Sequence, residues 1–262
     1  MRSGIGSDDP GRVSLWTENA LIASVALAAV IGTLIVLHRL EQLVSRYLSK
    51  RLGWNSVLFT GWLGVPIHEL SHLLAARLFG HRVVAYRLFE PDPVTGTLGY
   101  VRHAYSRRNL WQLSGSFFVG VAPVVAGGLC LALLVWLALP GISLDTVQAV
   151  LVGSLRLPIK GQELLQALSH HATPWLGLYI YLALCVASHL SPSAADLKNG
   201  AIGAVLCVAL IAFAVILCTL AEISLAPVRA LYPVLAALIA GVALLQLSYA
   251  ASVALLHRVG LI

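Results

Sequence analysis

Charged residues are scarce in this chain. Asp, Glu, Lys and Arg make up 11% of its 262 residues, whereas a soluble domain carries about 25%. Hydrophobic residues make up 59%, and apolar runs lie at roughly 19–37, 55–79, 111–139, 174–191, 200–225 and 230–256. Each is near or above the ~20 residues that a hydrocarbon core requires. The composition therefore excludes a soluble domain and predicts an all-α polytopic membrane protein with about six transmembrane helices.

Cysteine motifs and a nucleic-acid-binding charge pattern are also missing. The four cysteines all lie inside apolar runs without C-x-x-C spacing, which predicts buried small side chains and neither disulfides nor a thiolate metal site. The net charge of +6 comes from lysines and arginines in short connections between the runs, where basic residues anchor and orient membrane helices. We therefore expect a lipid bilayer as a partner, and no nucleic acid.

The chain shows no internal repeat and no segment large enough for a separate soluble core, so one membrane domain accounts for all of it. We divide it into a short polar N-terminus (1–18), a first span with an amphipathic continuation (19–53), a membrane core (54–200) and two C-terminal spans (201–262). Residues 39–51 suit either an interfacial helix or an extension of the first span. Residues 146–171 suit a helix on the membrane surface.

The connection between the second and third spans changes its periodicity. Residues 83–89 and 97–101 are β-prone, and 90–96 has turn chemistry, which predicts a small β-hairpin. His81 and His103, in the same polar connection, are expected to be solvated. Because an open sheet edge is not tolerated against lipid, the hairpin should lie at the surface or in a hydrated cavity.

The third span is rich in residues that disturb a helix or allow close packing. It contains Gly115, Gly120, Pro123, Gly127 and Gly128. Small residues let membrane helices approach closely, and proline interrupts the backbone ladder. Plain close packing and a functional role are both open interpretations of this cluster.

The most informative motif is His68-Glu69-Leu70-Ser71-His72, an H-E-x-x-H pattern inside the second apolar run. Helix geometry places the two histidines one turn apart on one face, where both rings can reach a single Zn²⁺. Glu69 lies on a neighbouring part of the turn, close enough to take a proton from a water on the metal. Because such groups are costly to bury in a bilayer, the motif predicts a hydrated cavity that contains zinc.

A catalytic zinc site needs a third protein ligand. Ala75 and Leu78 stand where the metzincin extension needs Gly and His, so that class is excluded. Glu90 is a candidate by distance along the chain, and His189 is a rival, but Asp196 is favoured. It follows the fourth span at a Pro/Ser-rich break, and spans two and four run in the same direction, so their ends approach the same membrane face. The alternative role of Asp196 is a cap of the next helix.

Three features together resemble one known family. They are the H-E-x-x-H motif in a membrane helix, the Gly120-Val121-Ala122-Pro123 element in the next span, and an Asp at a Pro-containing break two spans later. Over about residues 54–200 the chain resembles the site-2 protease family of intramembrane zinc metalloproteases. The resemblance implies that His68, His72 and Asp196 bind Zn²⁺ and that Glu69 is the catalytic base.

The chain departs from the family pattern at two places. Residues 193–197 read Ser-Ala-Ala-Asp-Leu in place of an Asn-Pro-Asp-Gly-like turn, and 122–126 read Ala-Pro-Val-Val-Ala in place of Gly-Pro-x-x-Asn. These departures indicate a divergent member of the family.

The predicted function is that of a zinc metalloendopeptidase that cleaves a membrane-protein substrate in or near a transmembrane segment. The resemblance implies a multi-pass protein of the bacterial inner membrane, acting in regulated intramembrane proteolysis on a single-pass regulator such as an anti-sigma factor. Basic residues slightly favour a cytoplasmic site mouth. The alternatives are a non-proteolytic membrane zinc-binding or transport protein, and an inactive family member that acts as a scaffold.

Overall fold

The computed structural model describes residues 10–138 and 174–258. The surface helix expected at 146–171 lies outside these residues. The described elements are, in chain order, α1 (Pro10–Leu52), α2 (Asn55–Leu78), β1 (Arg82–Arg87), β2 (Tyr100–Ala104), α3 (Leu110–Ala138), α6 (Leu176–Ala187), α7 (Ala194–Leu220), the 3-10 helix η2 (Ala226–Ala230) and α8 (Leu231–Arg258).

Among the described residues, four helical stretches are long and apolar enough to cross a membrane: Ser14–Leu52, Leu110–Ala138, Ala194–Leu220 and Ala226–Leu255. The expected spans at 55–79 and 174–191 are helical but fall outside this set. Helix α2 has 24 residues but carries the polar H-E-x-x-H motif. Helix α6 has only 12 residues, which corresponds to about 18 Å and is too short to cross a hydrocarbon core. The structure thus supports a helical membrane protein, with four of the six expected spans.

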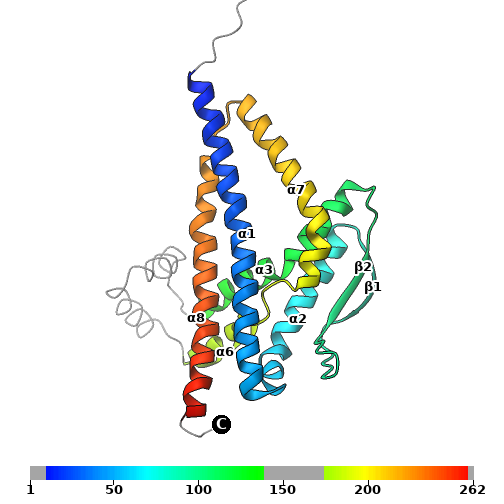
Figure 1. The fold of residues 1–262 in the computed structure, drawn as a ribbon, viewed down its shortest axis with the longest axis vertical. Helices are drawn as coiled ribbons and strands as arrows, with labels where there is room; N and C mark the ends of the chain where they lie inside the picture. Colours follow the sequence, from blue (N-terminus) through cyan, green and yellow to red (C-terminus); the bar gives the residue numbers. More distant parts are fainter. Residues whose placement is uncertain (1–9, 139–173, 259–262) are drawn as a thin grey trace, which may run out of the picture.

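Helix α1 continues without a break through residues 39–51, so this segment extends the first span and is not a separate interfacial helix. The helix ends at Leu52, before Gly53, whose φ of +64° an L side chain rarely adopts. α1 and α8 stand side by side along the long axis of the molecule (Figure 1). Two clusters of buried aliphatic side chains lie along this pair: Leu37 with Val242 and Leu190, and Val44 and Leu48 with Val253.

The hairpin forms as expected, but its second strand, β2, begins at Tyr100, whereas the sequence predicted a strand over residues 97–101. Its register pairs Arg82 with Ala104 and Arg87 with Tyr100, and a bulge leaves Val84 out of the pairing. Pro91 and Pro93 have no N–H to donate, so a regular ladder cannot run through the segment after β1. The chain there forms an irregular loop with only isolated backbone hydrogen bonds between its two sides.

The hairpin lies beside α2 on the side of the molecule away from α8 (Figure 1). Helix α3 packs against both α2 and α7. Together α2, α3, α7 and the end of α6 surround the H-E-x-x-H motif, and they position the candidate site.

Candidate metal centre

The two histidines of the motif point the same ring nitrogen at one place. The Nε2 atoms of His68 and His72 are 3.1 Å apart, and His72 is buried. Two nitrogens bound to one tetrahedral zinc at about 2.0–2.1 Å lie about 3.3 Å apart. The one-turn spacing in α2 therefore produces the separation that a shared metal ion requires.

Backbone carbonyl groups set the protonation of both rings. His68 Nδ1 donates to the backbone oxygen of His189, and His72 Nδ1 donates to that of Val119, each at 2.7 Å. A carbonyl oxygen can only accept, so both Nδ1 atoms carry the hydrogen, and in the neutral rings both Nε2 lone pairs are free. Two lone pairs that face each other at this distance favour a cation between them.

The carbonyl of Val119 is available to His72 because of Pro123. In a regular helix, the N–H of residue 123 would donate to this oxygen, but proline has no N–H. The interruption in α3 thus supplies an acceptor at the place where His72 needs one. This observation gives the Gly/Pro cluster of the third span a role at the site in addition to packing.

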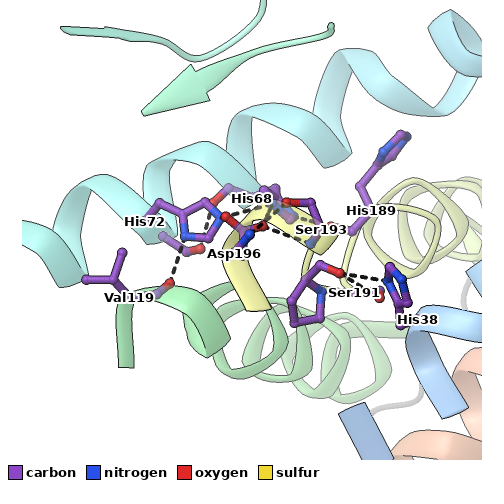
Figure 2. Close-up of polar contacts among 10 residues, drawn as sticks. His38, His68, His72, Val119, His189, Ser191, Ser193 and Asp196 are labelled. Carbon is purple, nitrogen blue, oxygen red and sulfur yellow. Dashed lines mark hydrogen bonds and ion pairs between the residues drawn. The ribbon is translucent and has the colours of Figure 1, made fainter. Parts of the chain in front are cut away.

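Asp196 completes the group. Its Oδ1 lies 3.4 Å from His72 Nε2 and its Oδ2 lies 3.8 Å from His68 Nε2. Atoms that could serve as ligands in all three residues lie within 4.8 Å of one another. Figure 2 shows the three side chains pointing toward a common centre. A mixed nitrogen and oxygen donor set of two His and one carboxylate is one that catalytic zinc sites use.

The capping role that the sequence also allowed for Asp196 is present as well. The Asp196 Oδ2 accepts the Ser193 N–H at 2.8 Å, and Ser193 Oγ accepts the Asp196 N–H at 3.1 Å, which forms a capping box at the start of α7. The two roles do not compete. The cap orients the carboxylate, and Oδ1 is left to face His72.

Glycines allow the backbones around the site to touch. A Cβ at Gly120 would lie 2.9 Å from the Asp196 carbonyl oxygen, so α3 and α7 are in backbone contact beside this candidate ligand. On α2, a Cβ at Gly64 would collide with the Cys185 carbonyl and would lie 2.6 Å from the His189 ring. These close approaches bring the end of α6 and the start of α7 within reach of α2.

Glu69 lies next to the cluster and below the hairpin loop. A Cβ at Gly99 would be 3.0 Å from Glu69 Cγ, so the loop before β2 covers this side chain. The carboxylate is close enough to His68, His72 and Asp196 to interact with them electrostatically. It therefore stands beside the candidate ligands without being one of the three.

The two rival third ligands lie elsewhere. Glu90 forms an exposed ion pair with Arg87 at 3.5 Å. The His189 ring points away from the cluster (Figure 2), and its Nε2 lies 3.1 Å from Thr60 Oγ1. His189 serves the site through its backbone oxygen instead of its ring.

The expectation that His81 is solvated is wrong. His81 is buried, its Nε2 donates to the Gln112 backbone oxygen at 2.7 Å, and its Nδ1 lies 3.0 Å from His103 Nδ1. These contacts join β2, through His103, to the short segment between α2 and β1 and, through Gln112, to the start of α3. Burial, with the nearby His81 ring, lowers the pKa of His103.

Sequence reasoning did not identify the two supporting carbonyl groups. For Val119 a signal was present, because Pro123 stands four residues later and frees its oxygen. For His189, the signal was its position near the end of the apolar run 174–191 and three residues before Pro192, where regular helical hydrogen bonding stops.

Comparisons of this chain with protein-family models, with curated proteins and with solved structures found no match.

Proposed function

We propose that this protein is an intramembrane zinc metalloendopeptidase that hydrolyses a peptide bond in or near a transmembrane segment of a membrane-protein substrate. One observation carries the proposal. His68 and His72 each donate from Nδ1 to a backbone carbonyl, so their Nε2 atoms are free to face the Asp196 carboxylate. This group lies beside Glu69 in a bundle of apolar helices. Ionisable side chains are costly to place inside a membrane protein, and they usually mark a functional site.

The candidate ligands and the candidate base have distinct roles. His68, His72 and Asp196 would hold Zn²⁺, which when bound supplies a Lewis acid that polarises a carbonyl group and acidifies water. Glu69 accepts a proton from the attacking water and passes it to the leaving amine. The carbonyls of Val119 and His189 keep the two imidazole rings in the tautomer and orientation that zinc binding through Nε2 requires.

The hairpin suits the binding of an extended substrate. In the two-stranded sheet each strand has one edge that the other strand does not pair, and a groove of about 550 Å³ follows β1, with Arg77 and residues 83–88 lining it. A transmembrane helix must unwind before its backbone can be cleaved, and pairing with a free strand edge would compensate its exposed hydrogen-bonding groups. In this proposal the substrate adds to the edge of the hairpin and reaches the site beside Gly99.

Two proline substitutions, Val84→Pro and Val101→Pro, test this role of the hairpin, and the bulge at Val84 makes their expected effects on the hairpin different. Val84 lies outside the β1–β2 register and is 61% exposed, so Val84→Pro alters the groove while most of the ladder is kept. Val101 pairs with Tyr86, so Val101→Pro breaks the hairpin itself and is the positive control. We expect both variants to lose cleavage while zinc content is kept. Undiminished cleavage by Val84→Pro would count against strand addition.

Resemblance to the site-2 protease family supports the finer parts of the proposal. They are a location in a bacterial inner membrane and a single-pass regulator such as an anti-sigma factor as the substrate. The distribution of basic residues along the chain, and not the resemblance, favours a site mouth on the cytoplasmic side. The four apolar helices support only the coarser statement that the protein is a membrane protein.

Metal analysis of the purified full chain tests the ligand set. We expect one zinc per chain in the original protein and in Glu69→Gln, and loss of zinc in His72→Ala and Asp196→Ala. Ser193→Ala is a matched control for Asp196, because it removes one bond of the capping box but no ligand. Zinc that persists in Asp196→Ala would overturn the ligand set.

Cleavage is tested by comparing membranes that contain the original chain with membranes that contain Glu69→Gln. New protein ends inside or next to transmembrane segments should be found with the original chain and should be absent with Glu69→Gln. Substrates should instead co-purify with that variant. Identical protein ends in both membranes would remove the protease proposal and would favour the zinc-binding or scaffold alternatives.

A further inference from the structure

A second polar region lies inside the helix bundle, apart from the three candidate ligands. It is a cavity between α1, α2, α8 and the residues that follow α6. Its wall is apolar in part, but it also includes the polar side chains of Glu41, Thr60, His189 and Gln246. Polar side chains of four separate segments thus line a region that contains none of the three candidate ligands.

Gln246 is the most informative of these side chains. It lies on α8, is only 2% exposed, and its Nε2 donates to the Ala187 backbone oxygen at 2.6 Å. Its Oε1 is also buried and has no hydrogen-bond partner among the described residues. A buried amide oxygen without a partner is unfavourable, and in native proteins such groups are normally satisfied by protein or by ordered water.

The cavity has the size and the partners that water requires. It offers about 40 Å³ to the centre of a water-sized sphere, whereas one water needs roughly 10–15 Å³ by this measure. A buried water makes two to four hydrogen bonds. Gln246 Oε1 and the Glu41 carboxylate are acceptors for a water, and the Thr60 hydroxyl can either donate or accept.

We propose that this cavity is a binding site for ordered water, held by Gln246 Oε1, Glu41 and Thr60. The water satisfies the free amide oxygen and joins α8 and α1 to α2. Through the Gln246–Ala187 bond it also supports the end of α6, two residues before the His189 carbonyl that holds His68. The proposal concerns the protein with or without metal, and it does not depend on proteolysis.

A double-mutant cycle on the full chain in detergent micelles, with a metal chelator present, tests the proposal. Val57 lines the cavity on α2, and Val57→Leu adds one methylene to the wall and displaces water. Gln246→Met keeps the length of the side chain and removes the amide oxygen that needs the water. We expect Val57→Leu to lower the midpoint of thermal unfolding by about 2–4 °C in the original chain, and to leave it unchanged or raise it in Gln246→Met.

Two results of this cycle would overturn the proposal. If Val57→Leu raises the midpoint equally in both backgrounds, the cavity is dry and the added methylene fills it. If it lowers the midpoint equally in both, the effect is steric and no water is involved. Should Gln246→Met fail to fold, an experimental structure of the original chain decides the question. Ordered water within hydrogen-bond distance of Gln246 Oε1 supports the site. An empty cavity, in maps that show other buried waters, contradicts it.

Discussion

The α1–α8 pair and the α3–α7 pair are both long helix contacts, but they are built from different residues. Along α1–α8 the contact consists of buried branched side chains such as Leu37, Val44 and Val253. Along α3–α7, the glycines Gly120, Gly200 and Gly203 bring the two backbones together. A Cβ at Gly203 would collide with Ser116 Oγ and would lie 2.5 Å from the Leu113 carbonyl oxygen. Side chains separate the first pair of helices, whereas backbones touch in the second.

This difference explains why the candidate metal centre lies beside α3–α7. Backbone contact lets the carbonyl of one helix and the carboxylate of another reach the same histidine, which a layer of leucines would prevent. The α1–α8 pair acts on the site indirectly. His38 on α1 donates through Nδ1 to the Pro192 backbone oxygen at 3.0 Å, and so holds the break between α6 and α7 (Figure 2).

The largest effect is expected when the backbone contact is forced apart. Gly203→Ala places a methyl group against the backbone of α3, which should destabilise the protein by about 1–3 kcal/mol. It should also lower zinc affinity by up to about 100-fold, since Asp196 lies on the same helix. Gly32→Ala on α1 is the matched control, because a Cβ there meets no described atom within 4 Å. Equal zinc affinity in both variants would contradict the claim that the α3–α7 backbone contact, unlike the α1–α8 contact, positions the candidate metal centre.

A smaller effect is expected from restoring the regular hydrogen bond in α3. Pro123→Ala supplies an N–H that competes with His72 Nδ1 for the Val119 oxygen. Zinc affinity should fall by about tenfold, and titration with a competing chelator measures the change. Pro233 lies at the start of α8, so Pro233→Ala is the control. A fall of the same size there would show that proline loss acts through helix geometry in general.

Truncation in the aliphatic contact should change stability but not metal binding. Val253→Ala removes two methyl groups from the cluster with Val44 and Leu48, which should cost about 1–2 kcal/mol of unfolding free energy. Zinc affinity should stay within about twofold of the original, because no backbone contact near the ligands is changed. A large loss of zinc would show that the two regions are not separable.

The smallest effect is expected in the hairpin loop, outside both regions. Hydrogen bonds from the Thr95 hydroxyl and the Val94 N–H lower the pKa of Asp92 below its usual 3.8. Because the pKa of Asp92 is lower in the folded loop than in the unfolded chain, its ionised carboxylate stabilises the loop when the pH is above the unfolded-state pKa. This stabilisation is lost as the pH falls through the folded-state pKa. Loop order, measured by amide exchange, should therefore be constant from pH 7 to about 5 and fall only in strong acid. Asp92→Asn should remove this dependence, and an unchanged acid transition in that variant would assign it to another group.

Local sequence pattern predicted the helical membrane architecture and the convergence of two of the candidate ligands. Apolar runs predicted α1, α3, α7 and α8, and the one-turn spacing predicted the convergence of His68 and His72. The number of spans was less accurate, because α6 ends after 12 residues within a longer apolar run. Hydropathy measures the composition of a run and does not detect where a helix stops inside it.

The remaining parts of the site depend on contacts between segments that are far apart in the chain. Spacing and turn chemistry determined that His68, Glu69 and His72 share part of one helix and that residues 81–108 form a hairpin. The tertiary structure decided that Asp196 is both a cap and a candidate ligand, that His189 contributes its carbonyl and not its ring, and that Gln246 has a buried amide oxygen without a partner among the described residues. Local pattern reflects the neighbours that a residue has along one helix or strand. The partners of Asp196, His189 and Gln246 come from other helices, and they are defined only when glycines and short breaks set how closely those helices approach.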